Sequence, residues 1–433
     1  MSGLPRHLAV LVVPALFAGA AVHAAGFALK EQSATYQGAA FAGATARADD
    51  PSTLFYNPAG IAKLDGYQIS LDMAAIMPSA EMTSGSATRN PFLGGSAITG
   101  TTAGNAAGSA IIGSLYATGR IAPDWALGLS ITAPYGLGTK YPTNSVARYQ
   151  ALTSVLRTTD FAPAIAWQVL PKLSIGAAMH IEYAEAKLSN AVDFGALIGF
   201  PGAADGIGTI KGNDTAVAWQ VGALWEPAQG TRIGLDYHSA AYHKLAGTIT
   251  FTGVPVPLST LFVNNSATAK LVTPDYATLG LAQDYGQWTF LADASFTRWS
   301  HFNQLLAYYG TSRSLTVENW RDTFGLSLGA DYRLNDQWTL RGGIAYDQSP
   351  VPDANRTPRV PDGDRYWLSV GATWKPTPKL ALSAAYTHIF VKDGGIALTD
   401  TGTPTSSSFG RGNVNAQYSS SIDILALQAT LKF

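Results

Sequence analysis

The sequence predicts an all-β protein, and specifically a transmembrane β-barrel. Of its 433 residues, 47% are hydrophobic and only 13% are charged, which is about half the charged fraction of an ordinary soluble domain. The mean hydropathy is nevertheless only +0.08, and beyond the first residues no apolar run reaches the roughly 18 residues that a membrane helix needs. A barrel satisfies both observations, because alternate residues of each strand face lipid and a polar lumen.

Residues 1–24 are expected to be a secretory signal peptide that is not part of the fold. Arg6 gives a positive start, residues 8–21 are apolar, and Val22-His23-Ala24 is a small-x-small cleavage site. The apolar stretch is too short for a membrane anchor. We therefore expect an exported chain that is cleaved after Ala24.

Residues 25–66 differ in texture from the rest of the chain. They are rich in Ala and Gly and show no sustained alternation, and short helical pieces, for example over 33–48, fit their composition. A wide barrel cannot be filled by its own side chains. We therefore expect 25–66 to be an N-terminal plug, or hatch, of short helices, followed by the barrel over 67–433.

From Tyr67 onward, apolar residues alternate with small or polar ones, as strands with one lipid-facing side require. In 324–334 every second residue is apolar, and the residues between them are Gly325, Ser327, Gly329, Asp331 and Arg333. Aromatic residues mark the strand ends, as in the interfacial girdle of a barrel: Trp338, Tyr346, Tyr366, Trp374 and Phe433. The alternative, a soluble β-sandwich, fits less well with the signal and the aromatic strand ends.

The alternation predicts fourteen antiparallel strands, an even number that closes the sheet and removes its edges. The expected strands are 67–78, 108–121, 125–134, 157–170, 172–188, 213–226, 231–252, 268–285, 287–309, 319–335, 336–348, 363–376, 378–391 and 417–433. Short turns connect them at one end. Long loops at the other end are expected over 79–107, 135–156, 189–212, 253–267, 310–318, 349–362 and 392–416. This asymmetry is typical of outer-membrane barrels with both termini in the periplasm.

Several segments carry a resemblance to a known family. They are Ala25-Gly26-Phe27, Asn57-Pro58-Ala59, residues 130–138 (SITAPYGLG), residues 338–352 and residues 361–365. In this order they are similar to the hatch, the third strand, and the eleventh and twelfth strands of the FadL-type long-chain fatty acid transporters of Gram-negative outer membranes. The resemblance covers the whole mature chain.

The resemblance implies a passive transport mechanism. Extracellular loops would collect a hydrophobic molecule, which enters an apolar pocket closed below by the hatch and leaves sideways into the outer membrane at a kink in the third strand. It implies a monomer whose partners are a hydrophobic ligand and outer-membrane lipid, without a cofactor or metal. The net charge of −1 gives no reason to expect a nucleic-acid partner.

The resemblance also assigns roles by matching motifs. The residues are Asn57, Pro58 and Ala59 in the hatch motif, Phe27 in the ligand pocket, Pro134, Tyr135 and Gly136 at the kink, and Asp347 as an inward wall residue that holds the hatch. Pro lacks a backbone donor and Gly is permissive, so both suit a bulge in a strand.

The chain departs from the family where basic residues are expected near a ligand head group, because it has Asn190 and Thr316 there. The basic residues that could substitute are Arg148, Arg157, Lys244 and Arg341. The ligand therefore stays open between a long-chain fatty acid and an aromatic or aliphatic hydrocarbon, which relatives also import.

Two other classes of protein fit the sequence less well. A general diffusion porin would lack the N-terminal plug. An enzyme would need an assembled site, but no signature marks the mature histidines, and His238 and His243 do not have a metal-ligand spacing on a strand. The chain has no cysteine, which excludes a thiolate site.

Overall fold

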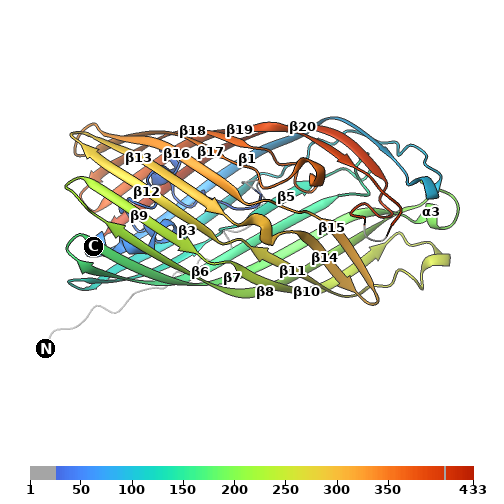
Figure 1. Cartoon of the computed structure of the whole chain (residues 1–433), viewed down its shortest axis with the longest axis horizontal. Helices are drawn as coiled ribbons and strands as arrows, with labels where there is room; N and C mark the ends of the chain where they lie inside the picture. Colours follow the sequence, from blue (N-terminus) through green and yellow to red (C-terminus); the bar gives the residue numbers. More distant parts are fainter. Residues whose placement is uncertain (1–25, 404–405) are drawn as a thin grey trace.

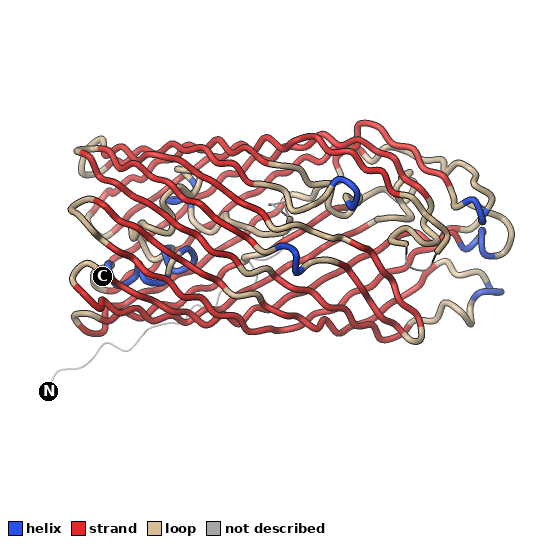
Figure 2. Tube along the Cα trace, viewed as in Figure 1, coloured by secondary structure: helices blue, strands red, loops and turns tan. Residues whose placement is uncertain are grey.

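The first and last barrel strands pair with each other along their whole length. In the computed structural model, which describes residues 26–403 and 406–433, β1 (Tyr67–Thr88) runs antiparallel to β20 (Asn413–Lys432). The predicted closed, antiparallel barrel of fourteen strands is confirmed (Figures 1 and 2). The expected signal over 1–24 lies outside the described residues.

Nine barrel strands are continuous and five are split in two. The continuous ones are β1, β3 (Ala110–Ala122), β6 (Thr153–Leu170), β7 (Leu173–Asp193), β8 (Asp205–Trp225), β17 (Trp338–Asp347), β18 (Arg365–Thr377), β19 (Leu380–Leu398) and β20. The split ones are β4 (Trp125–Thr132) with β5 (Gly136–Lys140), β9 (Thr231–His238) with β10 (Ala241–Thr252), β11 (Asn265–Thr273) with β12 (Tyr276–Tyr285), β13 (Trp288–Thr297) with β14 (Gln304–Tyr309), and β15 (Ser312–Val317) with β16 (Thr323–Arg333). A two-residue strand, β2 (Gly104–Asn105), pairs with β1.

Helices are short and few. The hatch contains α1 (Ala34–Gln37), α2 (Thr53–Tyr56) and a 3-10 helix (Pro58–Lys63), and the loops contain α3 (Phe194–Leu197) and the 3-10 turns Pro91–Leu93, Val256–Leu258, Trp299–His301 and Asp353–Asn355. No helix in the described part of the chain is long and apolar enough to cross a membrane.

The apolar face of each strand points outward, as the alternation predicts. Phe324, Leu326 and Leu328 are more than half exposed, whereas Ser327 between them is buried. Tryptophans near the short turns stack across strands, with ring centroids 5.3 Å apart for Trp125 and Trp167. Such an outer surface is stable only against lipid.

Several strands extend beyond the range that the alternation indicates. β1 continues to Thr88 instead of 78, and β8 begins at Asp205 instead of 213. The predicted loop 310–318 is a tight turn between β14 and β15, and the predicted loop 135–156 contains β5. Where a strand passes beyond lipid, its outward residues no longer need to be apolar, so the alternation that marks it disappears.

The hatch, residues 26–66, lies inside the barrel and is largely buried. The helical piece expected over 33–48 is wrong in extent, because α1 makes a single turn. Ala40 and Phe41, at φ 52° and 61°, adopt the left-handed conformation, which ends the helix. This backbone turns Phe41 toward Trp367 of the wall, with ring centroids 6.0 Å apart.

Glycines line the inner wall where the hatch touches it. A Cβ atom on Gly222 would lie 2.0 Å from Oδ1 of Asn57, and one on Gly343 would lie 2.2 Å from the carbonyl oxygen of Ala39. Backbone and side chains of the hatch therefore occupy the space that side chains at these positions would fill.

Candidate functional site

The third barrel strand is broken between β4 and β5. Thr132 pairs with Asp160 of β6, and Gly136 pairs with Arg157 of the same strand. Three residues separate the two pairing positions on the third strand, but only two separate their partners on β6, so the third strand contains one extra residue. This is a β-bulge at Pro134 and Tyr135, where the resemblance places the kink.

The start of the hatch fills the open edge of this bulge. The N–H of Tyr135 donates to Oγ1 of Thr158 on β6 (2.9 Å). On the opposite edge, the carbonyl of Pro134 accepts from the N–H of Leu29 (2.7 Å), and the N–H of Gly136 donates to the carbonyl of Phe27 (2.8 Å). Residues 27–29 therefore bind the edge that would otherwise pair with β3, whose ladder with β4 extends only to the Leu115–Ile131 pair.

Phe27 is enclosed by aromatic rings. It is 2% exposed and contacts Trp299, Phe302 and Trp320, with ring centroids 4.7, 5.4 and 5.4 Å away. These three residues come from the breaks in the ninth and tenth strands, which turn inward there. Sequence reasoning missed them, although the alternation is interrupted at both places.

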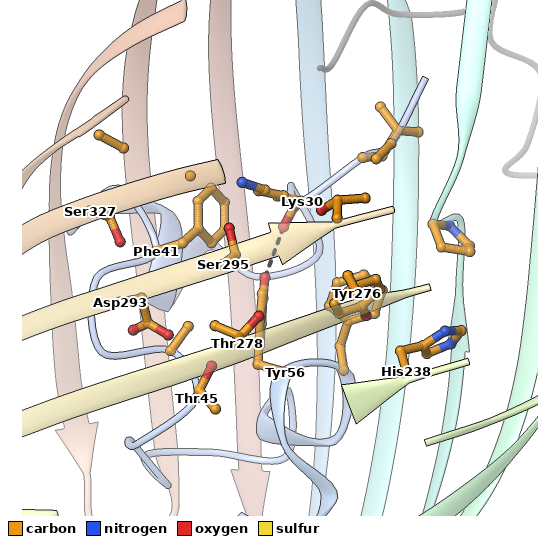
Figure 3. Close-up of a pocket in the computed structure, with 18 of the residues that line it drawn as sticks. Lys30, Phe41, Thr45, Tyr56, His238, Tyr276, Thr278, Asp293, Ser295 and Ser327 are labelled. Atoms are coloured by element: carbon orange, nitrogen blue, oxygen red, sulfur yellow. Dashed lines mark hydrogen bonds between the residues drawn. The ribbon is translucent and has the colours of Figure 1, made fainter. Parts of the chain in front are cut away.

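A cavity of about 130 Å³ lies between the hatch and the wall, next to the bulge (Figure 3). The hatch side is mostly apolar and includes Leu29, Ala40, Phe41, Ala44, Phe55 and Tyr56. Pro134 and Tyr135 of the bulge also line it. The cavity thus extends from residues 28–30 of the hatch to the break in the wall.

The opposite side of the cavity is polar, and much of it is internally paired. His180 lies between Oδ2 of Asp160 (2.7 Å) and Oε1 of Gln220 (3.2 Å), and its ring is 4.3 Å from that of His238. His238 stacks on Tyr276, with ring centroids 5.1 Å apart. The two imidazoles therefore have partners within the wall and can border an apolar ligand that supplies no hydrogen bonds. Oδ1 of Asp160 has no hydrogen-bond partner among the described residues.

Asn57 of the hatch motif connects two parts of the hatch to the wall. Its Nδ2 donates to the carbonyl oxygens of Thr45 (2.8 Å) and Ala223 (3.0 Å), and its Oδ1 accepts from the N–H of Ala59 (3.0 Å). Pro58 begins the 3-10 helix that packs on β7 and β8. The motif therefore lies at the contact between hatch and barrel.

Carboxylates of the wall also contact the start of the hatch. Asp347 points inward, and Nζ of Lys30 lies 3.4 Å from its Oδ2. Oδ2 of Asp362 accepts from the N–H of Gly26 (3.1 Å), and its Oδ1 pairs with Arg365 (2.5 Å). Residues 361–365 are one of the segments that carry the family resemblance. The hydrogen bond from Gly26 to Asp362 shows that this segment helps to hold the start of the hatch.

The structure brings none of the four basic residues named for a head group to the cavity. Arg157 and Lys244 have exposed side chains on the outer face of the barrel. Arg148 is held in a loop by Asp205 (2.9 Å), and Arg341 borders a separate space on the other side of the hatch. The expectation that Arg157 and Lys244 contact a head group inside the barrel is therefore wrong. The residues next to them in each strand point inward, and because side chains alternate along a strand, Arg157 and Lys244 point outward.

Two arginines, the buried Arg359 and the half-buried Arg411, lie near Asn190 and Thr316 instead. Nη1 of Arg359 donates to the carbonyl of Ser189 (3.4 Å), and Nη1 of Arg411 donates to Oγ1 of Thr316 (3.1 Å). Burial lowers the pKa of Arg359 to about 9, so this guanidinium stays charged at neutral pH. Both residues come from loops without periodicity, which is why sequence reasoning missed them.

The buried carboxyl of Glu31 makes the stability of the hatch depend on pH. Its Oε2 has no hydrogen-bond partner among the described residues, and burial raises its pKa from 4.5 to about 7. Between these values the folded state holds a proton that the unfolded state releases, so stability falls as the pH rises. Glu31→Gln is expected to increase the free energy of unfolding at pH 8 by up to about 3 kcal/mol and to change it little at pH 4.

Urea unfolding of the refolded barrel at both pH values measures this effect. The exposed Glu81→Gln is the matched control and should change neither value. A loss of stability in Glu31→Gln at pH 8 would show that the folded hatch needs the carboxylate.

Comparison with known proteins gives consistent matches over nearly the whole chain. A family described as outer membrane protein transport protein (OMPP1/FadL/TodX) matches residues 15–433. A long-chain fatty acid transport protein of Escherichia coli O6:H1 is 30% identical over 397 residues, covering 84% of this chain and 87% of that protein. A FadL homologue of Pseudomonas aeruginosa has a TM-score of 0.86 at 26% identity, covering 94% of this chain and 100% of that one. The toluene transporter TbuX of Ralstonia pickettii, with a TM-score of 0.67 at 20% identity over 93% and 99% of the two chains, shares the fold alone.

Proposed function

The chain belongs to the OMPP1/FadL/TodX family of outer membrane transport proteins, and we propose from this premise that it carries long-chain fatty acids through the outer membrane by lateral exit at the bulge in its third strand. The family is one of hydrophobic-compound transporters and not of enzymes. The end with the short turns is then periplasmic and the end with the long loops extracellular.

The observation that carries the proposal is the edge of the bulge held by residues 27–29. A segment of the hatch, and not a neighbouring strand, satisfies the backbone groups of Pro134 and Gly136. Hydrogen bonds to such a segment break without opening the sheet elsewhere. Release of residues 27–29 would withdraw Phe27 from its aromatic enclosure and expose the break in the wall in one step.

Lateral exit also fits the energetics of the ligand. Each CH₂ group gains about 0.8 kcal/mol on leaving water, so a water-filled pore offers a long acyl chain no favourable path. A route from the apolar side of the cavity directly to lipid avoids returning the chain to water. No energy source is then needed, because the membrane itself binds the product.

The arginines Arg359 and Arg411 support a ligand with a carboxylate. Among the described residues, the carboxyl of Glu318, whose pKa burial raises to about 7, acts on both arginines, and Asp400 acts on Arg411 as well. This positively charged region on the extracellular side would receive the head group while the acyl chain lies toward Phe27. A carboxylate is the group that a guanidinium binds best by paired hydrogen bonds.

A second candidate ligand is a monoaromatic hydrocarbon, favoured by the size of the cavity. At about 130 Å³, it is close to the roughly 150 Å³ of an apolar cavity that binds benzene. Only part of a long acyl chain would fit in this cavity, and the rest would need Phe27 to move. The structural likeness to a toluene transporter shows the fold alone and does not decide between the two.

Uptake of labelled oleate and labelled toluene by cells that lack their own transporter tests the proposal. We expect oleate to accumulate when this chain is expressed, and to accumulate several-fold less in an Arg359→Gln/Arg411→Gln variant. Toluene uptake without oleate uptake would favour the second candidate. Uptake of neither, by a correctly inserted barrel, would contradict the transport route itself.

A further inference from the structure

Basic residues gather on the outer face of the barrel near the extracellular ends of the fourth to eighth strands. Their side chains are exposed and point away from the lumen: Arg157 on β6, Lys187 on β7, Lys211 on β8, Lys244 on β10 and Lys270 on β11. We call these five residues the basic patch. Two of them, Arg157 and Lys244, are among the residues expected at a head group inside the barrel, and because they point outward, a ligand that they bind lies outside it.

The lysines of the basic patch face one another in pairs. Lys187 lies directly opposite Lys211 across the β7–β8 ladder, and Lys244 lies directly opposite Lys270 across the β10–β11 ladder. Residues opposite each other on one face of an antiparallel pair have Cβ atoms only about 5 Å apart, and like charges there are destabilising. Two such pairs on adjacent hairpins therefore indicate that an anion shares the surface.

The protein itself supplies almost no such anion. Glu185, opposite Arg157, is an acidic neighbour on the same face, and Oδ2 of Asp214 accepts a hydrogen bond from the backbone N–H of Lys244 (2.8 Å). In the described part of the chain, no hydrogen bond or ion pair joins the side chains of the basic patch to another residue. The excess positive charge is thus available to a ligand.

The position of the basic patch relative to the lipid-facing band indicates where this ligand is located. On the same strands, exposed apolar residues lie next to the patch on the side toward the short turns. They are Phe161 beside Arg157, Tyr183 beside Lys187, and Tyr242 beside Lys244. Aromatic residues such as these tyrosines mark the border of the lipid-facing band. The basic patch therefore lies at the level of the lipid head groups of the outer leaflet.

Exposed basic residues also occur at the extracellular ends of other strands, for example Arg313 on β15 and Lys392 on β19. Neither of these two lies opposite another basic residue in its ladder, because Arg313 pairs with Tyr308 and Lys392 lies at a register shift. The two directly opposed lysine pairs therefore distinguish the basic patch from these isolated charges.

We propose that the basic patch is a binding site for a phosphorylated lipid of the outer leaflet, with the lysine pairs holding its phosphate groups. Clustered lysines beside a membrane attract anionic head groups, each contributing about fivefold to affinity. The acyl chains of the lipid would lie on the apolar band below, next to the strands that precede the patch. This side of the barrel includes the fourth strand, which flanks the bulge.

Binding of fluorescent diphosphorylated lipid A to the purified full chain in a neutral detergent tests the proposal. The variant is Lys187→Gln/Lys211→Gln/Lys270→Gln. The matched control replaces three exposed lysines at the periplasmic end, Lys172→Gln/Lys375→Gln/Lys379→Gln. We expect affinity on the order of 100-fold weaker in the first variant and within twofold of the parent in the control. Raising the salt concentration should weaken the parent's binding.

Competition with unlabelled ligands identifies the group that is recognised. We expect diphosphorylated lipid A to displace the probe, and lipid A without phosphates or inorganic phosphate alone to displace it poorly. Equal binding by the patch variant and the parent, equal loss in the control variant, or equal competition by the phosphate-free lipid would overturn the proposal. The single variant Lys187→Gln removes one like-charge contact and keeps the other lysines. We expect its affinity for the lipid to be about fivefold weaker than that of the parent.

Discussion

Deletion of Pro134 is expected to reduce oleate uptake at least tenfold, toward the background of cells without the barrel. The third strand has one residue more than β6 between its pairing positions at Thr132 and Gly136. Removing one residue makes the number of residues between the two pairing positions equal on both strands, so β4 and β5 can form one straight strand. That strand would then offer β3 the edge now bound by residues 27–29, and the wall would close.

The control for this deletion is removal of Ser259, an exposed residue of the β10–β11 loop. Both variants should migrate as folded barrels on unheated gels, because neither deletion removes a wall pairing. Uptake should fall only in the first. If the Pro134 deletion folds and still transports oleate at the parental rate, the ligand does not leave through the bulge.

Substitution of Gly343 by Ala is expected to loosen the hatch and to make the barrel conduct ions. The new Cβ would lie 2.2 Å from the carbonyl oxygen of Ala39, which is backbone and can move only with the hatch. Overpacking of this kind costs about 1–3 kcal/mol. A fourteen-stranded barrel whose plug is displaced has a wide aqueous lumen, so single-channel current in a planar bilayer should rise severalfold.

The neighbouring Gly342 provides a matched control in the same strand. Its Cβ would meet nothing within 4 Å, because it points outward. Gly342→Ala should therefore keep the parental conductance and thermal stability. Equal conductance and stability in both variants would show that the hatch does not rest on the glycines of the wall.

Sequence periodicity predicts the lipid-facing part of this fold well. The alternation in 324–334 gives both the strand and its direction, because a lipid-facing residue must be apolar at every second position. Residues beyond the lipid bilayer do not have to be apolar at every second position. β1 beyond Pro78 and β8 before Asn213 are therefore strands that carry no apolar signal.

The candidate site is predicted only where a motif marks it. Asn57 and Pro134 are found from their neighbours in the sequence. The structure gives the Asn57 side chain a hydrogen-bonding role and places Pro134 in the bulge, where its carbonyl binds the hatch. Trp299 and Trp320 lie in strand breaks and meet only when the ninth and tenth strands fold. Arg359 lies in a loop and contacts Ser154, about two hundred residues away in the sequence, only in the folded chain. The direction of Lys244 depends on strand register, and a charged residue alone does not reveal it.

The most direct test of the account is a reversible tether between the hatch and the bulge. Ala28 and Tyr135 form an isolated antiparallel bridge, and hydrogen bonds flank it on both sides, the arrangement that brings Cα atoms to about 4.5 Å, suitable for a disulfide. Because the chain has no cysteine, Ala28→Cys/Tyr135→Cys should form a single cross-link. Ala107→Cys/Thr139→Cys, at a second bridge of the same kind, is the matched control.

The measurement is uptake of labelled oleate and toluene by both double variants, oxidised and then reduced. If residues 27–29 must leave the bulge for a ligand to pass, oxidation should stop uptake in the Ala28→Cys/Tyr135→Cys barrel and reduction should restore it, while the control transports in both states. A fully cross-linked Ala28→Cys/Tyr135→Cys barrel that takes up its ligand as fast as the reduced one would contradict the proposed route.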